Sequence, residues 1–364
     1  MGTITRSIAN NIVTGGKLDG TDGLNGTIPA SNIADSSLTS VTSLSPSLGS
    51  AITSVSVDPP APVEGQMWYN SSSGTLKGYQ LANVNAFASG GNVNTARGAG
   101  GVSGTATAGI IFGGNTAPGN IKATESYNGT SWTTLPASMN TARYYAGSAS
   151  AGTQTATLAF GGSPAVAASE SYNGTSWTAT PSLNTGRYGG GGAGTQTAAL
   201  FFGGVNPVVA TTEKWNGSAW TTVPSMNTTR GYLAGCGLST AALGFGGYTP
   251  GGATTASESY NGTSWTNTPS LNTARYSLSG FGIQTAAICA GGAGAASYST
   301  NTESYNGTSW TANPTGLATG RFRATGLGSQ TSGLVISGKG PSTAYITSTE
   351  AWSGQALRTR TVTV

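Results

Sequence analysis

An octapeptide recurs along the chain at a nearly constant interval, and this repeat limits the possible folds more than any other feature. ESYNGTSW occurs at 125–132, 170–177, 258–265 and 303–310, with the related EKWNGSAW at 213–220 and EAWSGQAL at 350–357. The copies begin 45, 43, 45, 45 and 47 residues apart. A fixed period of this length indicates one supersecondary unit repeated six times.

Two further markers run in phase with the octapeptide. A tetrapeptide ending in Arg precedes each copy, at 94–97, 140–143, 184–187, 227–230, 272–275 and 318–321. Between the two markers an apolar run ends in a Gly pair in five copies, at 113–114, 161–162, 203–204, 246–247 and 291–292. The sixth copy reads VISGKG at 335–340 and has lost the pair. Adjacent glycines allow positive φ and close backbone approach at a strand end.

Each unit is predicted to form four short strands, the last two joined at an Asn-Gly pair. Asn128-Gly129 lies between two strand-like segments, and Asn-Gly favours a two-residue type I′ hairpin turn. Four strands in about 45 residues, repeated in sequence, are typical of a β-propeller. We therefore expect an all-β chain whose main body is a closed six-bladed ring. A capped, open solenoid is the structural alternative. The expected blades are 98–142, 143–186, 187–229, 230–274, 275–320 and 321–360.

The order Arg, apolar strand, Gly-Gly, Glu-x-Tyr, Trp resembles the kelch repeat over about 265 of the 364 residues. This resemblance implies a six-bladed kelch-like β-propeller. It does not imply one activity, because a shared fold can carry many functions.

One Trp recurs at a single register, and either of two roles would explain it. The set can form a ligand-stacking platform, or each indole can pack between neighbouring blades, which we favour. The residues are Trp132, Trp177, Trp220, Trp265 and Trp310.

Charged residues of the main body also follow the repeat. The Glu series is Glu125, Glu170, Glu213, Glu258, Glu303 and Glu350. The Arg series is Arg97, Arg143, Arg187, Arg230, Arg275 and Arg321. The arginines can form an anion clamp, but we favour structural pairing of each Arg with a Glu through a bidentate contact.

The residue inventory argues against an enzyme, so we predict no catalytic residue, cofactor or metal site. His is absent, which excludes imidazole bases and Ser-His triads, as well as the His ligands of kelch-like copper oxidases. Six equivalent Glu lack the asymmetry that a glycosidase pair requires. The 15 basic residues are scattered, and no apolar run approaches a membrane span. We expect neither nucleic-acid binding nor membrane insertion.

The chain before the repeats differs in composition. We divide it into an extended arm (1–60), a β-hairpin element (61–84) and the propeller (85–364). The arm has no aromatic residue and offers too little apolar surface to fold alone. It can anchor to a partner through Ile4, Ile8, Ile12, Val13, Leu18 and Leu24. Either the hairpin or the C-terminal RTRTVTV can supply the strand that closes the ring.

Two phrases of the N-terminal region, NGTIPASNIADSSL (25–38) and EGQMWYNSSSGTLKGY (64–79), resemble those of bacteriophage tail-fibre and other virion appendage proteins. The resemblance implies a non-enzymatic virion structural protein. Residues 1–60 would bind other virion proteins, the propeller would face a host-surface glycan or protein, and the chain would be a homo-oligomer in the assembly. A carbohydrate-binding propeller of a cell-surface or secreted protein is the alternative.

Overall fold

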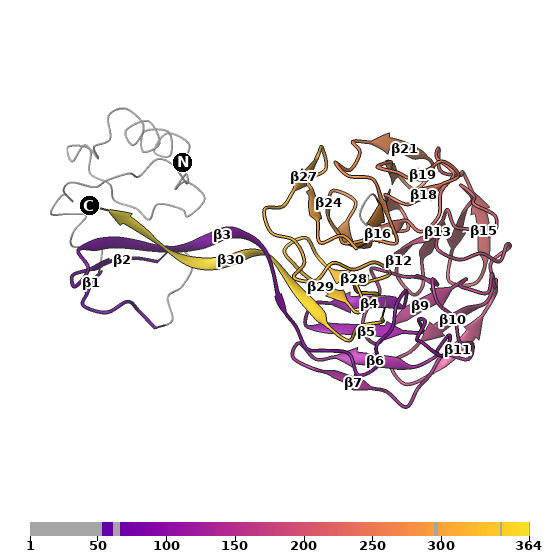
Figure 1. Ribbon diagram of the computed structural model, residues 1–364, viewed down its shortest axis with the longest axis horizontal. Coiled ribbons are helices and arrows are strands. Elements are labelled where there is room, and N and C mark those ends of the chain that lie inside the picture. Colours follow the sequence, from indigo (N-terminus) through magenta and orange to yellow (C-terminus); the bar gives the residue numbers. More distant parts are fainter. Residues whose placement is uncertain (1–52, 61–65, 295–297, 343, 364) are drawn as a thin grey trace. The chain divides into compact units, whose positions relative to one another are not determined.

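The computed structural model describes residues 53–60, 66–294, 298–342 and 344–363, and within these ranges the chain forms strands and no helix. The described residues fall into two compact units: one lies within Asn85–Gly354, and the other combines the described parts of 1–84 and 355–364. The first is a six-bladed β-propeller (Figure 1), so the predicted all-β propeller fold is confirmed. Most of the predicted arm, residues 1–52, lies outside the described residues.

Five blades are four-stranded antiparallel sheets whose first strand lies nearest the ring centre (Figure 1). Blade 1 contains β4 (Gly101–Thr105), β5 (Ala108–Phe112), β6 (Thr124–Tyr127) and β7 (Trp132–Thr134). Blade 2 contains β8 (Gly147–Ser148), β9 (Thr157–Phe160), β10 (Ser169–Tyr172) and β11 (Trp177–Thr180). Blade 3 contains β12 (Gly191–Gly194), β13 (Ala199–Phe202), β14 (Thr212–Trp215) and β15 (Trp220–Val223).

Blades 4 and 5 follow the same plan and each adds a small two-stranded ribbon. Blade 4 contains β16 (Ala234–Leu238), β17 (Ala241–Phe245), β20 (Ser257–Tyr260) and β21 (Trp265–Thr268), with the ribbon β18 (Tyr248–Thr249) and β19 (Gly252–Ala253). Blade 5 contains β23 (Ser279–Ile283), β24 (Ala286–Ala290), β26 (Thr302–Tyr305) and β27 (Trp310–Ala312), with the ribbon β22 (Arg275–Tyr276) and β25 (Ala293–Gly294).

Blade 6 is built from both ends of the repeat region. Its inner three strands are β28 (Thr325–Gly328), β29 (Ser332–Ile336) and the first part of β30 (Thr349–Thr363). The outermost strand is β3 (Thr75–Ser89), which neighbours β30 in the sheet. Just after β3, the backbone N–H of Gly90 donates to the carbonyl of Thr349 at 2.8 Å. The strand that completes the last blade therefore comes from the N-terminal side of the repeats.

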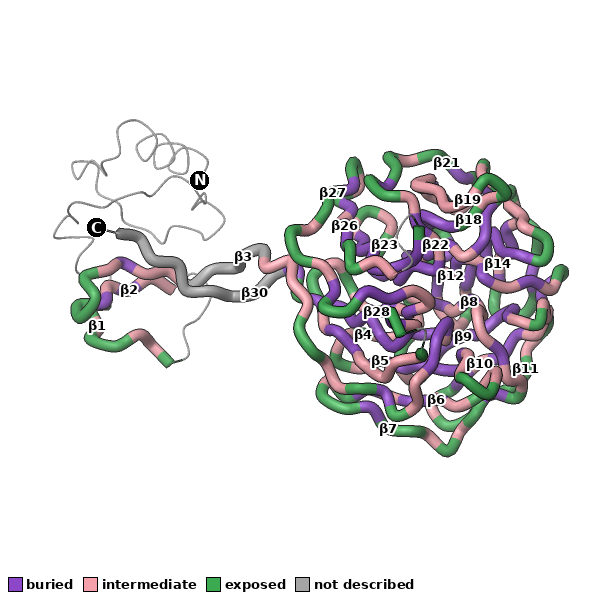
Figure 2. The backbone as a smooth tube through the Cα atoms, in the orientation of Figure 1, coloured by how far each residue is buried: buried purple, intermediate pink, exposed green. Residues whose placement is uncertain are grey.

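In the five four-stranded blades burial is highest in the second strand and lowest in the fourth. All four residues of β9 and of β13 are buried, because these second strands are covered on both faces by neighbouring blades. In the outer strands the first residue, Trp, is buried and the next two are exposed, as in β7 and β11. Figure 2 shows this change from buried backbone near the centre to exposed backbone at the rim.

The ring is closed by contact and by hydrogen bonding. The inner strands neighbour one another in the order β4, β8, β12, β16, β23, β28 and back to β4. In every blade the N–H of the second residue of the Gly-pair register donates to the carbonyl of the next blade's register Arg, over 2.8–3.0 Å. The donor and acceptor pairs are Gly114–Arg143, Gly162–Arg187, Gly204–Arg230, Gly247–Arg275, Gly292–Arg321 and Gly338–Arg97. The last pair joins blade 6 to blade 1, which excludes an open solenoid.

In five blades the geometry of this interface favours glycine at the first position of the Gly pair. At Gly113 the backbone has φ of +62°, and a Cβ there would lie 2.7 Å from the carbonyl oxygen of Arg143. Both the left-handed conformation and the contact disfavour any side chain. In the sixth copy Ser337 takes the equivalent position with φ of +58°. Its hydroxyl accepts the N–H of Arg97 at 3.1 Å, a bond that no glycine can make.

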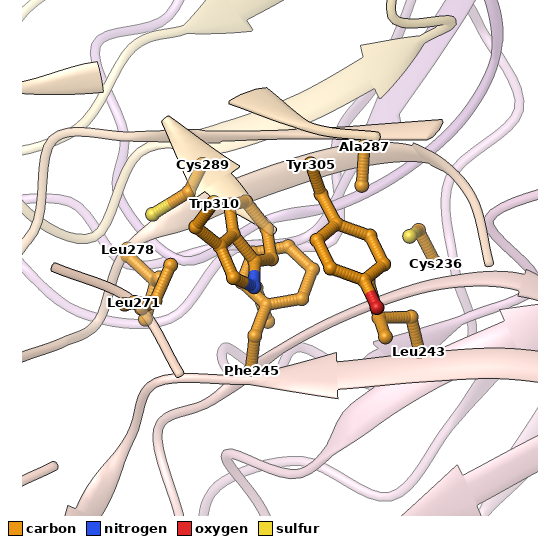
Figure 3. Close-up of a cluster of buried hydrophobic side chains, with 10 residues drawn as sticks. Cys236, Leu243, Phe245, Leu271, Leu278, Ala287, Cys289, Tyr305 and Trp310 are labelled. Atoms are coloured by element: carbon orange, nitrogen blue, oxygen red, sulfur yellow. The ribbon is translucent and has the colours of Figure 1, made fainter. Parts of the chain in front are cut away.

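The register tryptophans lie between blades. Trp177, Trp220, Trp265 and Trp310 pack against a Phe of the preceding blade, with ring centroids 4.7–4.9 Å apart. Figure 3 shows Trp310 against Phe245, with Cys236 and Cys289 in the same cluster. Trp132 shares a cluster with Leu334 and Ile336 of blade 6. All five indoles are 5–6% exposed, so their faces are not open to a ligand.

The predicted type I′ turn at Asn-Gly is wrong. Tyr127 pairs with Trp132, so four residues separate the strands, and of Asn128 and Gly129 only the glycine has positive φ. The Asn128 Oδ1 atom accepts the backbone N–H groups of Thr130 and Ser131, at 3.0 and 2.9 Å. This side-chain bonding stabilises the longer loop and removes the need for a left-handed Asn.

The smaller unit contains the predicted hairpin. β2 (Met67–Asn70) pairs with the start of β3, and β1 (Thr53–Val55) runs parallel to β2. Asp58 accepts hydrogen bonds from the side chains of Trp68, Asn70 and Lys77, at 3.0, 2.7 and 2.6 Å. The bonds from Lys77, Asn70 and Trp68 lower the pKa of Asp58 to about 2.

We predict that Trp265→Ala destabilises the propeller by about 3–5 kcal/mol, the usual cost of truncating a buried Trp. The substitution removes the contact with Phe202 and the hydrogen bond from Nε1 to Thr212 Oγ1 at 3.0 Å. Ile283→Ala is the control, because Ile283 is 56% exposed and should change stability by less than about 0.5 kcal/mol. Denaturant unfolding measures both. Equal stability of the wild type and Trp265→Ala would contradict the packing role.

We also predict that Gly113→Ala destabilises the protein by at least about 2 kcal/mol, since it combines backbone strain with overpacking. Gly251→Ala is the matched control, because a Cβ at Gly251 would meet only Thr249 Oγ1 at 3.6 Å. Thermal unfolding of the two variants provides the comparison. Equal melting temperatures would show that the interface adapts to a side chain.

Candidate binding site

The structure brings the predicted Arg and Glu series together as one buried ion pair in each blade. The pairs are Arg97–Glu125, Arg143–Glu170, Arg187–Glu213, Arg230–Glu258, Arg275–Glu303 and Arg321–Glu350. Every member has a side chain no more than 6% exposed. These arginines therefore do not face a ligand as an anion clamp.

Blade 4 shows how each pair is held. One guanidinium nitrogen of Arg230 contacts Glu258 Oε1 at 3.2 Å, and Nη1 donates to the Gly246 carbonyl at 3.1 Å. The carboxylate also accepts the backbone N–H groups of Asn227 and Thr228, at 2.7 and 3.1 Å. The expected bidentate contact is absent here because these backbone groups occupy the carboxylate. Burial lowers the pKa of Arg230 to about 10, so the side chain remains charged at neutral pH.

A second ring of backbone hydrogen bonds surrounds one mouth of the central channel. Each residue two positions after the register Arg donates its N–H to the equivalent residue of the preceding blade, over 2.5–2.9 Å. All six residues have positive φ, between +50° and +66°. We call this ring the collar; its residues are Ala99, Tyr145, Gly189, Tyr232, Ser277 and Arg323.

The collar backbone is six-fold, but its side chains are not. Small, aromatic, hydroxyl and cationic residues lie around one opening, beside a cavity of about 110 Å³. Glycine and serine of the inner strands form much of the remaining cavity wall. Chemical asymmetry around a concave opening is what a specific ligand site requires.

Tyr145 spans the mouth. Its hydroxyl lies 2.7 Å from Ser277 Oγ, although Tyr145 belongs to blade 2 and Ser277 to blade 5 on the opposite side of the ring. The Tyr232 ring lies 4.9 Å from the Tyr145 ring, and the Arg323 guanidinium carbon lies 5.4 Å from the same ring. Burial raises the pKa of Tyr145 to about 12, so the phenol is neutral and can donate or accept hydrogen bonds.

More tyrosines continue outward from the mouth. Neighbouring rings lie 4.9–6.4 Å apart in a chain from blade 2 to blade 4 and on to Tyr276 of blade 5. These residues are half-buried, except that Tyr248 is 39% exposed. The chain of rings contains Tyr144, Tyr145, Tyr188, Tyr232, Tyr276 and Tyr248, and we call it the tyrosine face.

This site was not predicted, although the sequence carries a signal for it. Tyr144, Tyr188, Tyr276 and Phe322 directly follow a register Arg, and Tyr232 lies two positions after one. Within the propeller, the predicted Arg, Glu and Trp residues all lie at positions that repeat. The informative positions are those beside the repeat whose residue type changes from blade to blade.

The residues predicted to form sites lie away from the cavity or outside the described residues. The Arg, Glu and Trp series lie within and between blades, and none lines the cavity. The proposed anchor residues, Ile4 to Leu24, lie outside the described residues. Within the described ranges no group of three or more potential metal ligands occurs. The same residues include no helix long and apolar enough to span a membrane.

No model of a known protein family matches the chain, and no curated protein matches it.

We predict that Glu258→Gln lowers stability by about 3–5 kcal/mol, because it leaves the buried charge of Arg230 uncompensated. Lys214→Gln serves as the control, since it removes a charge that no carboxylate of the described residues pairs with and should cost less than about 0.5 kcal/mol. Denaturant unfolding at neutral pH distinguishes them. A loss below 1 kcal/mol for Glu258→Gln would contradict this account of the pair.

The raised pKa of Tyr145 predicts that the stability of the folded protein falls at high pH. Its pKa in the folded protein is about 12, whereas an unfolded Tyr titrates near 10. The resulting contribution to stability is present below about pH 10 and lost as the pH rises through about 12. Tyr145→Phe should lose less stability than the wild type across this window, as measured by unfolding at each pH. Parallel pH profiles would show that Tyr145 does not contribute.

Proposed function

We propose that this protein is a non-enzymatic structural component of a bacteriophage virion, of the tail-fibre or appendage type, with a kelch-like propeller displayed for contact with the host surface. The binding role is supported by where the propeller places its charged and its varied side chains. All six Glu are held in buried ion pairs, while the tyrosine face and collar present varied groups around one mouth. Such a surface favours recognition over acid–base catalysis.

The virion assignment is supported by the N-terminal phrases at 25–38 and 64–79, which resemble those of phage appendage proteins. Both connections of the propeller to the rest of the chain run through β3 and β30, which are neighbours in one sheet. This topology suits a module displayed on a support. In this proposal residues 1–60 bind other virion proteins, and the chain is a homo-oligomer in the particle.

A carbohydrate-binding propeller on a cell surface is the second candidate. The tyrosine face supports it equally, because Tyr rings combine flat apolar faces with hydroxyl groups. The two candidates differ in where the protein resides. Association with virus particles is therefore the deciding observation.

We predict that deleting residues 2–52 leaves a soluble, folded protein that no longer joins the particle. The deletion ends at residue 52 because β1 and Asp58 contact the hairpin. Circular dichroism and thermal unfolding check the fold, and quantitative mass spectrometry of purified particles checks incorporation. Full-length protein expressed in parallel is the control. Normal incorporation of the truncated protein would contradict anchoring through this segment, and absence of the full-length protein from particles would contradict the virion assignment.

A further inference from the structure

Arg323 differs from every other Arg of the propeller. Residues 85–354 contain seven Arg and six Glu, and all six Glu are paired with the six register arginines. Arg323 therefore has no carboxylate partner in the propeller. Its Nη1 donates to the Tyr345 hydroxyl at 3.3 Å, and its buried Nε has no acceptor. Three paired arginines also leave Nε without an acceptor, so the missing carboxylate is the distinguishing feature.

The position of this charge is significant because Arg323 is a collar residue that lines the cavity. A partly buried guanidinium without a counter-charge is energetically costly. Nothing in the propeller can supply that counter-charge, since its sequence holds no Asp and no further Glu. The nearby Lys339 adds to the positive charge, with Nζ 5.5 Å from the centre of the Tyr345 ring. The mouth is therefore complementary to an anion.

The groups around Arg323 indicate which kind of ligand would contain the anionic group. The Arg323 guanidinium lies over the Tyr145 ring, and the Tyr232 ring lies beside it, tilted by 58° with the centroids 4.9 Å apart. Flat aromatic faces favour a ligand with an apolar face, and the phenol and Ser277 hydroxyls favour a ligand with hydroxyl groups. A cavity of about 110 Å³ admits a carboxylate with a few waters, and leaves a sugar ring to lie on the tyrosines.

We infer that the collar binds the carboxylate of an acidic sugar residue, with Arg323 as the anion ligand and Tyr145 and Tyr232 contacting the sugar ring. The inference deepens the proposed host-surface contact and rests on it for the biological source, an acidic surface polysaccharide. Planar guanidinium and planar carboxylate form strong charge-assisted hydrogen bonds, which explains an Arg at this register in blade 6.

The test is calorimetric titration of the full-length protein with trigalacturonate, its methyl ester and inorganic phosphate. We expect trigalacturonate to bind, the uncharged ester to bind at least about tenfold more weakly, and phosphate not to compete at equal concentration. Arg323→Gln should weaken trigalacturonate binding by about tenfold to a hundredfold, as expected for loss of a charged hydrogen-bonding partner. Lys214→Gln, which removes a cation on the third strand of blade 3, should bind as the wild type does.

Thermal unfolding of Arg323→Gln checks that the variant folds, and Arg323→Lys, which keeps the charge without the planar fork, should recover part of the affinity. The inference is overturned if trigalacturonate does not bind at millimolar concentration, if the ester binds equally well, or if Arg323→Gln binds as the wild type does. Effective competition by phosphate would show a generic anion site and also overturn it. Because particle incorporation is measured separately, acid-sugar binding by a protein absent from virions would refute only the virion proposal.

Discussion

Six buried arginines organise this propeller, because each connects its own blade and also joins it to the preceding one. Within the blade the guanidinium contacts a Glu and donates to backbone carbonyls, as Arg230 does with Glu258 and Gly246. Between blades the Arg carbonyl accepts the N–H of a Gly-pair residue, as in the bond from Gly204 to Arg230 at 3.0 Å. Buried charge is tolerated at these positions because nearly every polar group around it has a partner.

This arrangement explains why the propeller is rich in glycine and contains few unpaired charged side chains. Close approach of the Gly pair to the next blade leaves no room for a Cβ, as at Gly113, and repeats of this contact multiply the glycine count. Every Glu of the blades is paired with a register Arg. Chemical variety is consequently confined to positions beside the repeat, of which the collar is the clearest case. A closed set of hydrogen bonds holds its backbone in one conformation, whereas its side chains are of five different types.

Much of the fold could be predicted because its markers are local and periodic. The 43–47-residue spacing predicts six units, and the Gly pair predicts a close backbone approach. The Asn-Gly turn was predicted wrongly because the same dipeptide supports two loop types. Which one forms depends on whether the Asn side chain accepts the next N–H groups, as Asn128 does. The collar was missed because Ala99, Tyr145 and Arg323 share no residue type and become equivalent only through their backbone conformation.

By itself the sequence determined the number of blades, the strands within them and the residues that recur for packing and pairing, since these depend on short-range pattern. Only the tertiary structure decided which strand completes blade 6, since β3 and β30 are more than 200 residues apart and pair through backbone groups common to all residues. The structure likewise decided that Tyr145 reaches Ser277 across the channel and that Arg323 lacks a carboxylate partner. Ring closure brings those side chains together, and no local pattern encodes a contact between opposite blades.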